Sequence, residues 1–219
     1  MTTKVKICGL KTEPTLDAAL DGGAEFVGFN FFPPSPRSLA PDAARSLAAR
    51  ARGRARTVAV LVDPDDALLR RVVSAVEPDL VQLHGKENPE RVAEIARLFG
   101  RPVIKALSVT TADDAEKAMA YRDVAEFVLF DAKAPPASVI PGGNGLTFDW
   151  HLLDGVRGRF DYFLSGGLTP GNVAEAIRLV QPFAVDVSSG VETAPGVKSP
   201  DLIRRFLAAA KPSYAAAQS

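Results

Sequence analysis

Two kinds of apolar pattern alternate along almost the whole sequence. Short runs rich in β-branched and aromatic residues are separated by longer stretches in which apolar residues recur every three or four positions. The first pattern is typical of buried strands and the second of helices packed on one face, so we predict repeated strand–helix units around a parallel sheet. The expected strands cover residues 5–8, 26–31, 57–62, 80–84, 103–107, 127–131, 162–165 and 184–188.

Eight helices are expected to follow these strands, the sixth of them a short one around residues 148–153. Pro89 and Pro200 lie near helix starts and Gly100 follows a helix end, which is where these residues are usually found. Eight units in 219 residues favour a compact (β/α)8 barrel, since typical barrels have ~250 residues. We therefore predict one α/β domain, a TIM barrel over residues 1–210, with a frayed tail over 211–219.

An open, doubly wound sheet is the alternative fold. It would normally carry a glycine-rich GxGxxG turn after its first strand, and the turn at 8–12 does not match that pattern.

Composition argues against several classes of protein. Lys plus Arg equals Asp plus Glu at 26 each, so no net charge attracts nucleic acid or an anionic membrane. The single cysteine cannot form an internal disulfide and leaves no CxxC metal site. The first residues lack the apolar core of a signal peptide, and the most apolar run, 26–32, is too short to cross a bilayer. We expect a cytoplasmic protein.

Polar residues inside the apolar strands are the first candidates for a site. Side chains alternate along a strand, and a helix-covered outer face would penalise charged groups, so we expect these residues to face the lumen. They are Lys6, Cys8, Gln82, His84, Lys105, Asp131, Asp186 and Ser188. Most lie near the carboxyl end of a strand, where barrel enzymes have their active sites.

The order of the strands suggests two pairings among these residues. Because the eighth strand closes against the first, Asp186 can reach Lys6, and we favour an ion pair over a direct catalytic role. Cys8 is either an inert core residue or a reactive thiol. With Asp131 at the end of the sixth strand, it could form a pair of base and acid.

Small residues follow the last two strands. The turns Ser165-Gly166-Gly167 and Ser188-Ser189-Gly190 let the backbone approach a ligand closely, and barrels frequently bind phosphate at these two places. The alternative is two tight turns that bind nothing, but their joint occurrence favours a phosphorylated small-molecule substrate.

Two longer loops could also contact a ligand. The proline-rich loop 32–38 carries Arg37, which could bind a carboxylate through its guanidinium fork or could lie solvated on the surface. The loop 134–145 is longer than most strand–helix connections and could be a lid or a plain flexible loop. His84 is either an interior histidine or a substrate contact.

These motifs, taken together and in this order, resemble one family, the phosphoribosylanthranilate isomerases of tryptophan biosynthesis. The matching segments are Lys6-Ile7-Cys8-Gly9-Leu10, Gly28-Phe29-Asn30-Phe31, Ser35-Pro36-Arg37, Gln82-Leu83-His84-Gly85, Leu129-Phe130-Asp131, Gly142-Gly143-Asn144-Gly145, Phe148-Asp149-Trp150, Ser165-Gly166-Gly167-Leu168 and Asp186-Val187-Ser188-Ser189-Gly190-Val191-Glu192. The resemblance implies a (β/α)8 barrel with Cys8 as general base, Asp131 as general acid and Arg37 as the anchor of the anthranilate carboxylate. It also implies that the two small-residue turns hold the phosphate. Asn144 departs from the Thr or Ser that the family often has there.

The activity implied by the resemblance is an Amadori rearrangement, which isomerises an aminoaldose to an aminoketose without metal or organic cofactor. As the acid Asp131 must carry a proton, and as the base Cys8 must be a thiolate, which a nearby cation would stabilise. Lys6 lies too far down the strand to be assumed that cation. We expect a monomer, with a homodimer as the alternative.

Two other classes of function stay open. One is a different phosphosugar barrel enzyme, such as the histidine-pathway isomerase or indoleglycerol-phosphate synthase. The first would be expected to use two aspartates, and the second to have an N-terminal extension before its first strand. The other is a non-catalytic barrel that binds a phosphorylated ligand, although Cys8, Arg37 and Asp131 are all present.

Overall fold

Eight parallel strands form a closed barrel in residues 2–133, 138 and 141–211, the part of the chain that the computed structural model describes. Each strand pairs with the next along the chain, and the last pairs with the first. The strands are β1 (Lys4–Cys8), β2 (Phe26–Asn30), β3 (Arg56–Leu61), β4 (Leu80–Leu83), β5 (Val103–Val109), β6 (Phe127–Ala132), β7 (Tyr162–Leu164) and β8 (Ala184–Val187). The predicted (β/α)8 barrel is therefore confirmed.

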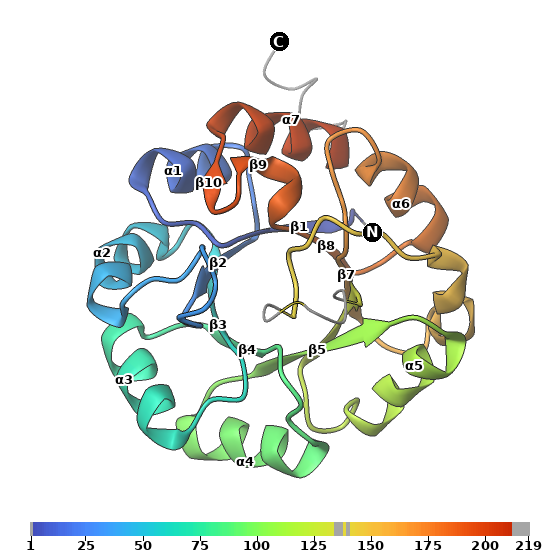
Figure 1. The fold of residues 1–219 in the computed structure, drawn as a ribbon, viewed down its shortest axis with the longest axis horizontal. Helices are drawn as coiled ribbons and strands as arrows, with labels where there is room; N and C mark the ends of the chain where they lie inside the picture. The colour runs from blue at the N-terminus through green and yellow to red at the C-terminus, as the bar shows by residue number, and fades with distance from the viewer. Residues whose placement is uncertain (1, 134–137, 139–140, 212–219) are drawn as a thin grey trace.

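A ring of helices surrounds the strands (Figure 1). The α-helices are α1 (Glu13–Asp21), α2 (Pro41–Ala51), α3 (Asp66–Val76), α4 (Pro89–Phe99), α5 (Ala112–Glu116), α6 (Val173–Val180) and α7 (Pro200–Ala210). Helix α4 starts at Pro89 and is followed by Gly100, whose φ of 59° is in the left-handed region that suits glycine. Each helix buries one apolar face against the strands.

The prediction of an α-helix after the sixth strand is wrong about the type of helix. After β6 the chain forms a 3-10 helix, η2 (Trp150–Val156), because the apolar pattern there is short and Gly155 interrupts it. The α-helix after β5 is also short, because α5 passes directly into another 3-10 helix, η1 (Lys117–Ala120).

Aromatic side chains fill the amino-terminal end of the barrel. Phe26 and Phe127 pack edge-on against Phe163, with ring centroids 5.1 and 5.3 Å away, and Phe183 stacks on Phe127. Burial of each such ring stabilises the fold by about 1.5–3 kcal/mol. This floor leaves only the carboxyl ends of the strands for a cavity.

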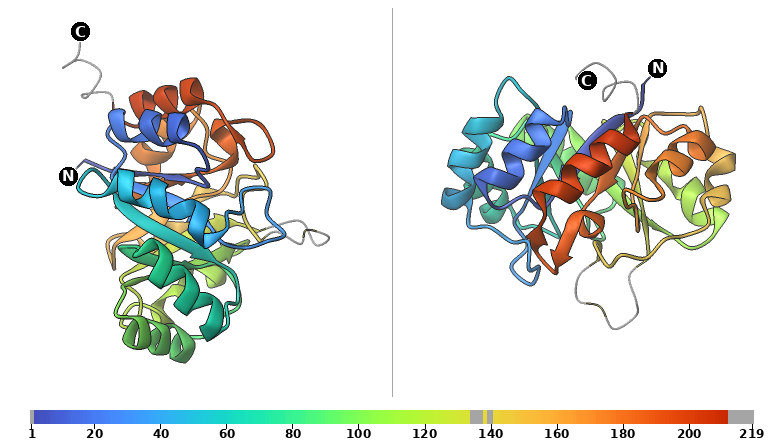
Figure 2. Two further views of the ribbon diagram at one scale, coloured as in Figure 1. Left: turned by 90° about the vertical axis from the view of Figure 1, so that its left-hand side faces the viewer. Right: turned by 90° about the horizontal axis from the view of Figure 1, so that it is seen from above.

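The connections that follow β2 and β8 project from the same end of the barrel, whereas the amino terminus lies at the opposite end (Figure 2). The connection after β8 holds a short 3-10 helix, η3 (Ser189–Val191), and an unpredicted antiparallel hairpin of β9 (Glu192–Ala194) and β10 (Val197–Lys198). The turn of this hairpin is Pro195-Gly196, a pair of residues common in turns.

The prediction that all polar strand residues face the lumen is wrong for Lys105. Its neighbours Ile104 and Ala106 belong to the core inside the barrel, so Lys105 points to the outer side. Its charge is tolerated there because the loop after β4 brings Glu87 to 2.7 Å and the Gly85 carbonyl to 2.8 Å. A side chain from another element thus removed the penalty on which the prediction depended.

Most of the expected frayed tail, 212–219, lies outside the described residues. Lys211 follows α7, and its Nζ donates a hydrogen bond to the carbonyl of Gly23 at 2.7 Å.

Candidate active site

Lys6 and Asp186 form the predicted ion pair in the lumen, above the aromatic floor. The Lys6 Nζ lies 2.9 Å from Asp186 Oδ1, and their side chains are 0% and 5% exposed. Ser165 at the end of β7 donates a weaker hydrogen bond to Asp186 Oδ2 at 3.4 Å. Burial by itself lowers the pKa of Lys6, but Asp186 and Cys8 outweigh it and the net shift is upward. The ammonium is therefore held charged.

Cys8 ends β1 beside this pair. A Cβ atom built on Gly28 of the neighbouring strand would lie 3.1 Å from the Cys8 Sγ and 3.4 Å from the Lys6 Nζ, so the two groups are neighbours. The expectation that Lys6 lies too far away is wrong, because its long side chain extends up the lumen past one residue of strand. Burial raises the pKa of the Cys8 thiol, while Lys6 and Lys198 oppose this, and the net shift is upward.

Asp131 is the next-to-last residue of β6 and is 4% exposed. Its Oδ1 accepts a hydrogen bond from the amide of Ala132 at 2.9 Å. Its Oδ2 lies 3.3 Å from His84 Nε2, without the geometry of a hydrogen bond. The amide of Gln82 donates to His84 Nδ1 at 3.2 Å, which leaves the hydrogen of a neutral imidazole on Nε2, facing Asp131.

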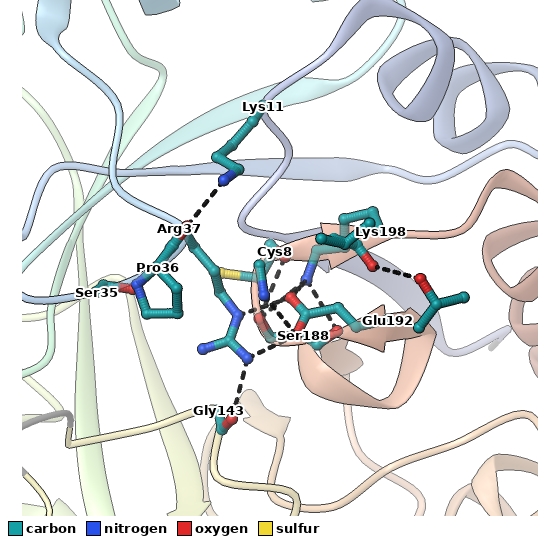
Figure 3. Close-up of polar contacts among 12 residues, drawn as sticks. Cys8, Lys11, Ser35, Pro36, Arg37, Gly143, Ser188, Glu192 and Lys198 are labelled. Carbon is teal, nitrogen blue, oxygen red and sulfur yellow. Dashed lines mark hydrogen bonds and ion pairs between the residues drawn. The ribbon is translucent and has the colours of Figure 1, made fainter.

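Arg37 lies in the loop after β2 and is 5% exposed, so it is not a solvated surface residue. Glu192 of β9 accepts from its Nε and Nη2, both at 2.8 Å, and the Gly143 carbonyl accepts from Nη2 at 3.1 Å. One edge of the fork is therefore occupied by a carboxylate of the chain itself. Lys11 holds this loop, since its Nζ donates a hydrogen bond to the Pro36 carbonyl at 2.8 Å (Figure 3).

The two small-residue turns lie against each other at the mouth. Gly166 and Gly167 have left-handed φ values of 87° and 62°. A Cβ on Gly190 would lie 1.8 Å from the carbonyl oxygen of Leu168, so only glycine allows this contact. Ser188 donates to the carbonyl of Cys8 at 3.3 Å, which ties the second turn to β1.

Part of the expected lid covers the site. A Cβ on Gly142 would lie 2.6 Å from Asp131 Oδ2 and 2.7 Å from the His84 ring. Residues 134–137 and 139–140 of this loop lie outside the described part of the chain.

One cavity of about 730 Å³, including its part open to solvent, joins these groups. Cys8, Arg37, His84, Asp131, Gly166, Gly167, Asp186, Ser188 and Ser189 line it. Gly190 supports the turn from behind and is absent from this lining. Among the described residues no group of three or more His, Cys, Asp or Glu side chains could hold a metal ion, and no helix is long and apolar enough to span a membrane.

Sequence reasoning misses the roles of Glu192 and Lys198. Glu192 belongs to one of the matching motifs but is assigned no contact there, and Lys198 is not singled out. The signal that could have found them is the Pro195-Gly196 turn, because it folds the two charged residues of the hairpin onto one side.

The fold and the cavity define the class, a (β/α)8-barrel enzyme with its site at the carboxyl ends of the strands. The model of the N-(5'-phosphoribosyl)anthranilate (PRA) isomerase family matches residues 5–209. The chain belongs to this family, whose members are isomerases of tryptophan biosynthesis.

Relatives and solved structures agree with this assignment. The isomerase of Rhodopseudomonas palustris is 54% identical over 97% of this chain and 98% of its own length. That of Rhizobium meliloti is 53% identical over 96% and 98%. The crystal structure of the Thermotoga maritima enzyme has a TM-score of 0.87 at 41% identity, covering 96% of this chain and 100% of that one.

A further structure of a phosphoribosylanthranilate isomerase contains reduced 1-(o-carboxyphenylamino)-1-deoxyribulose 5-phosphate. Its TM-score is 0.84 at 38% identity, covering 96% of this chain and 100% of that one. The family assignment resolves the alternatives of another phosphosugar enzyme or a non-catalytic barrel.

Proposed function

We propose that the cavity converts N-(5-phosphoribosyl)anthranilate into 1-(2-carboxyphenylamino)-1-deoxyribulose 5-phosphate with Asp131 as general acid and Cys8 as general base. The observation that carries this proposal is that a carboxyl group and a thiol from β6 and β1 line one cavity at the carboxyl ends of the strands. The residue roles implied by the family resemblance fit this arrangement.

The first step opens the sugar ring. Asp131 donates a proton to the furanose ring oxygen, the bond from that oxygen to C1 breaks, and the lone pair of the anthranilate nitrogen forms a protonated Schiff base with C1. The Nε2 atom of His84, 3.3 Å from Asp131 Oδ2, is near enough to assist this carboxyl group. His84 Nε2 and Gln82 Oε1 are buried without a hydrogen-bond partner among the described residues, and a hydroxyl group of the sugar could satisfy them.

The second step moves a proton from carbon. The Cys8 thiolate removes the proton on C2, the electron pair forms a C1–C2 double bond, and the Schiff-base nitrogen becomes neutral. The resulting enolamine tautomerises to the ketone, so the sugar is isomerised without an external oxidant or cofactor. The Lys6 ammonium beside Cys8 supplies the cation that stabilises the thiolate.

Binding uses both ends of the cavity. Arg37 takes the anthranilate carboxylate, and the turns at Gly166-Gly167 and Ser188-Ser189-Gly190 take the phosphate through backbone N–H groups. Asp186 lines the cavity, and its ion pair with Lys6 supports the base more directly than the substrate.

We further propose a monomer in the cytoplasm. Only three large apolar side chains are exposed among the described residues, namely Leu98, Leu146 and Val197. They belong to different parts of the chain, so no single helix or strand presents a broad apolar surface to a second copy. The related Thermotoga maritima isomerase is dimeric, and monomers generated from it have been crystallised. A homodimer is therefore the alternative, and sedimentation velocity distinguishes the two states.

The catalytic roles are tested by following the fluorescence of phosphoribosylanthranilate, generated in situ, with the wild type, Cys8→Ala and Asp131→Asn. Each substitution should lower kcat by at least ~10²-fold while leaving the melting temperature close to wild type. Conversion that survives Cys8→Ala would keep the family activity and refute the base. No conversion by the folded wild type would refute the activity itself.

A further inference from the structure

Glu192 of β9 is a buried carboxylate between two buried cations. Its side chain is 4% exposed, that of Arg37 is 7% exposed and that of Lys198 is 2% exposed. The Lys198 Nζ lies 2.7 Å from Glu192 Oε1, opposite the two contacts with Arg37 (Figure 3). Burying a carboxylate costs free energy unless cations nearby compensate its charge. Because the chain supplies two such cations here, we look for a specific role of Glu192.

All the acceptor positions of Glu192 are in use. Oε1 accepts from Arg37 Nε at 2.8 Å and from Lys198 Nζ at 2.7 Å. Oε2 accepts from Arg37 Nη2 at 2.8 Å and from the amide of Gly196 at 3.2 Å. A carboxylate has about four lone-pair sites, so each one here faces a donor. Only an ionised carboxylate satisfies the four donors together, because an amide would turn N–H groups toward two of them.

This arrangement fixes which part of Arg37 is available. The Nε and Nη2 atoms are held by Glu192, and Nη2 also donates to the carbonyl of Gly143. The Nη1 atom makes no hydrogen bond to any described residue and carries no dashed line in Figure 3. Arg37 lines the cavity, so this nitrogen is the part left to bind a ligand.

The charges of the cluster do not cancel. Arg37 and Lys198 contribute two positive charges and Glu192 one negative charge, which leaves one positive charge in a buried place. A carboxylate bound at Nη1 would neutralise this positive charge, whereas a substrate ring without a carboxylate would not. A ligand carboxylate at Nη1 would meet this net positive charge while Cys8, whose thiol interacts electrostatically with Lys198, is protonated.

We propose that Glu192, held by Lys198, is a positioning residue that orients Arg37 so that Nη1 recognises the carboxylate of the substrate. This inference deepens the proposed function and depends on the role given there to Arg37. Lys198 also donates to the carbonyl of Ser188 at 2.9 Å and to its hydroxyl at 3.2 Å. The same lysine therefore connects the carboxylate end of the cavity with the turn proposed to hold the phosphate.

The test compares two inhibitors of the purified full-length enzyme. One is reduced 1-(o-carboxyphenylamino)-1-deoxyribulose 5-phosphate, and the other is the same molecule without the ring carboxylate. The measured quantity is the ratio of their inhibition constants, which reports how well the enzyme recognises the carboxylate. Four variants are compared with the wild type, namely Arg37→Met, Glu192→Gln, the double variant and the surface control Asp201→Asn, whose side chain is 73% exposed.

Glu192→Gln should weaken the carboxylate inhibitor by about tenfold and the other inhibitor by less than about twofold, since one charge-assisted hydrogen bond loses its geometry. In the Arg37→Met background the same substitution should change the ratio by less than about twofold, because Glu192 acts through Arg37. Asp201→Asn should leave both constants unchanged. A purely structural role of Glu192 would weaken both inhibitors equally, and that result would overturn the inference.

The two proposals fail in different ways. If Arg37→Met leaves the ratio at its wild-type value, Arg37 does not bind the carboxylate and its proposed role is wrong. If Arg37→Met abolishes the preference but Glu192→Gln does not reduce it, only the positioning role of Glu192 is refuted. Should Glu192→Gln not fold, Lys198→Met removes the excess positive charge while keeping the Arg37–Glu192 pair, and it should also reduce the ratio. An unchanged ratio in a folded Lys198→Met variant would overturn the inference.

Discussion

Removing either member of the Lys6–Asp186 pair should destabilise the fold, and the two losses should depend on pH in opposite ways. The two charged atoms are 2.9 Å apart and the side chains are 0% and 5% exposed, so each charge depends on the other for most of its compensation. Breaking a buried pair by removing one partner costs about 3–5 kcal/mol. For a chain of this size, each kcal/mol lowers the melting temperature by about 2–4 °C, which gives a fall of about 6–20 °C for Asp186→Asn or Lys6→Met.

The sign of the pH dependence identifies the charge that is left alone. In Asp186→Asn a buried ammonium remains, its folded pKa falls below the unfolded one, and the variant regains stability as the pH rises. In Lys6→Met a buried carboxyl group remains, to which Ser165 donates its hydrogen bond of 3.4 Å. Its folded pKa rises above the unfolded one, so this variant regains stability as the pH falls.

Thermal unfolding of both variants and the wild type between pH 5 and 9 measures these differences. The double variant Lys6→Met with Asp186→Leu is the matched control, because an apolar pair of similar volume often costs little or nothing. It should recover most of the melting temperature and still lack most of the activity, since Cys8 has then lost its cation. Single-variant losses below about 1 kcal/mol, or the same pH trend in both, would refute a desolvated ion pair.

Two other buried groups give predictions of their own. The pKa of the Cys8 thiol is raised from its ordinary value of 9.0, so kcat/KM of the wild type should increase with pH above neutrality as the thiolate fraction grows; a profile that is flat from pH 7 to 9 would contradict Cys8 as the base. Glu87→Ala leaves the Lys105 ammonium buried on the outer side of β5, which should lower the stability by about 3–5 kcal/mol in urea unfolding. Neither Glu87 nor Lys105 lines the cavity, so KM should stay within about twofold of wild type, and a larger change would show that the pair shapes the site.

Local patterns in the sequence were enough to predict the barrel. Strand and helix periods give the repeated unit, and the closure of β8 on β1 then brings Asp186 to Lys6, although they lie 180 positions apart. The parity of side chains along each strand correctly assigns Lys6, Gln82 and Asp131 to the lumen, because apolar neighbours fix which face is inward.

The contacts made by loops could not be predicted in this way. Lys105 has the same local pattern as Lys6, and its outward position is favourable because Glu87 and the Gly85 carbonyl lie next to it. The pairing of Arg37 with Glu192 depends on a hairpin whose geometry follows from a single turn, and the two residues are 155 positions apart. Such contacts depend on the distances between elements in three dimensions. The apolar periodicity of a helix and the alternation of side chains along a strand do not specify these distances.

The groups around Cys8 come from the first and the last strand of the barrel and the turn after the last strand. Lys6 and Cys8 are translated 180 codons before their partners Asp186 and Ser188. Lys6 lies on the same strand as the thiol, but Asp186 joins them only when β8 pairs with β1 and the barrel closes. If the roles proposed for these residues hold, we expect chains that are stalled or truncated before β8 to be inactive, because the site is complete only in the closed barrel.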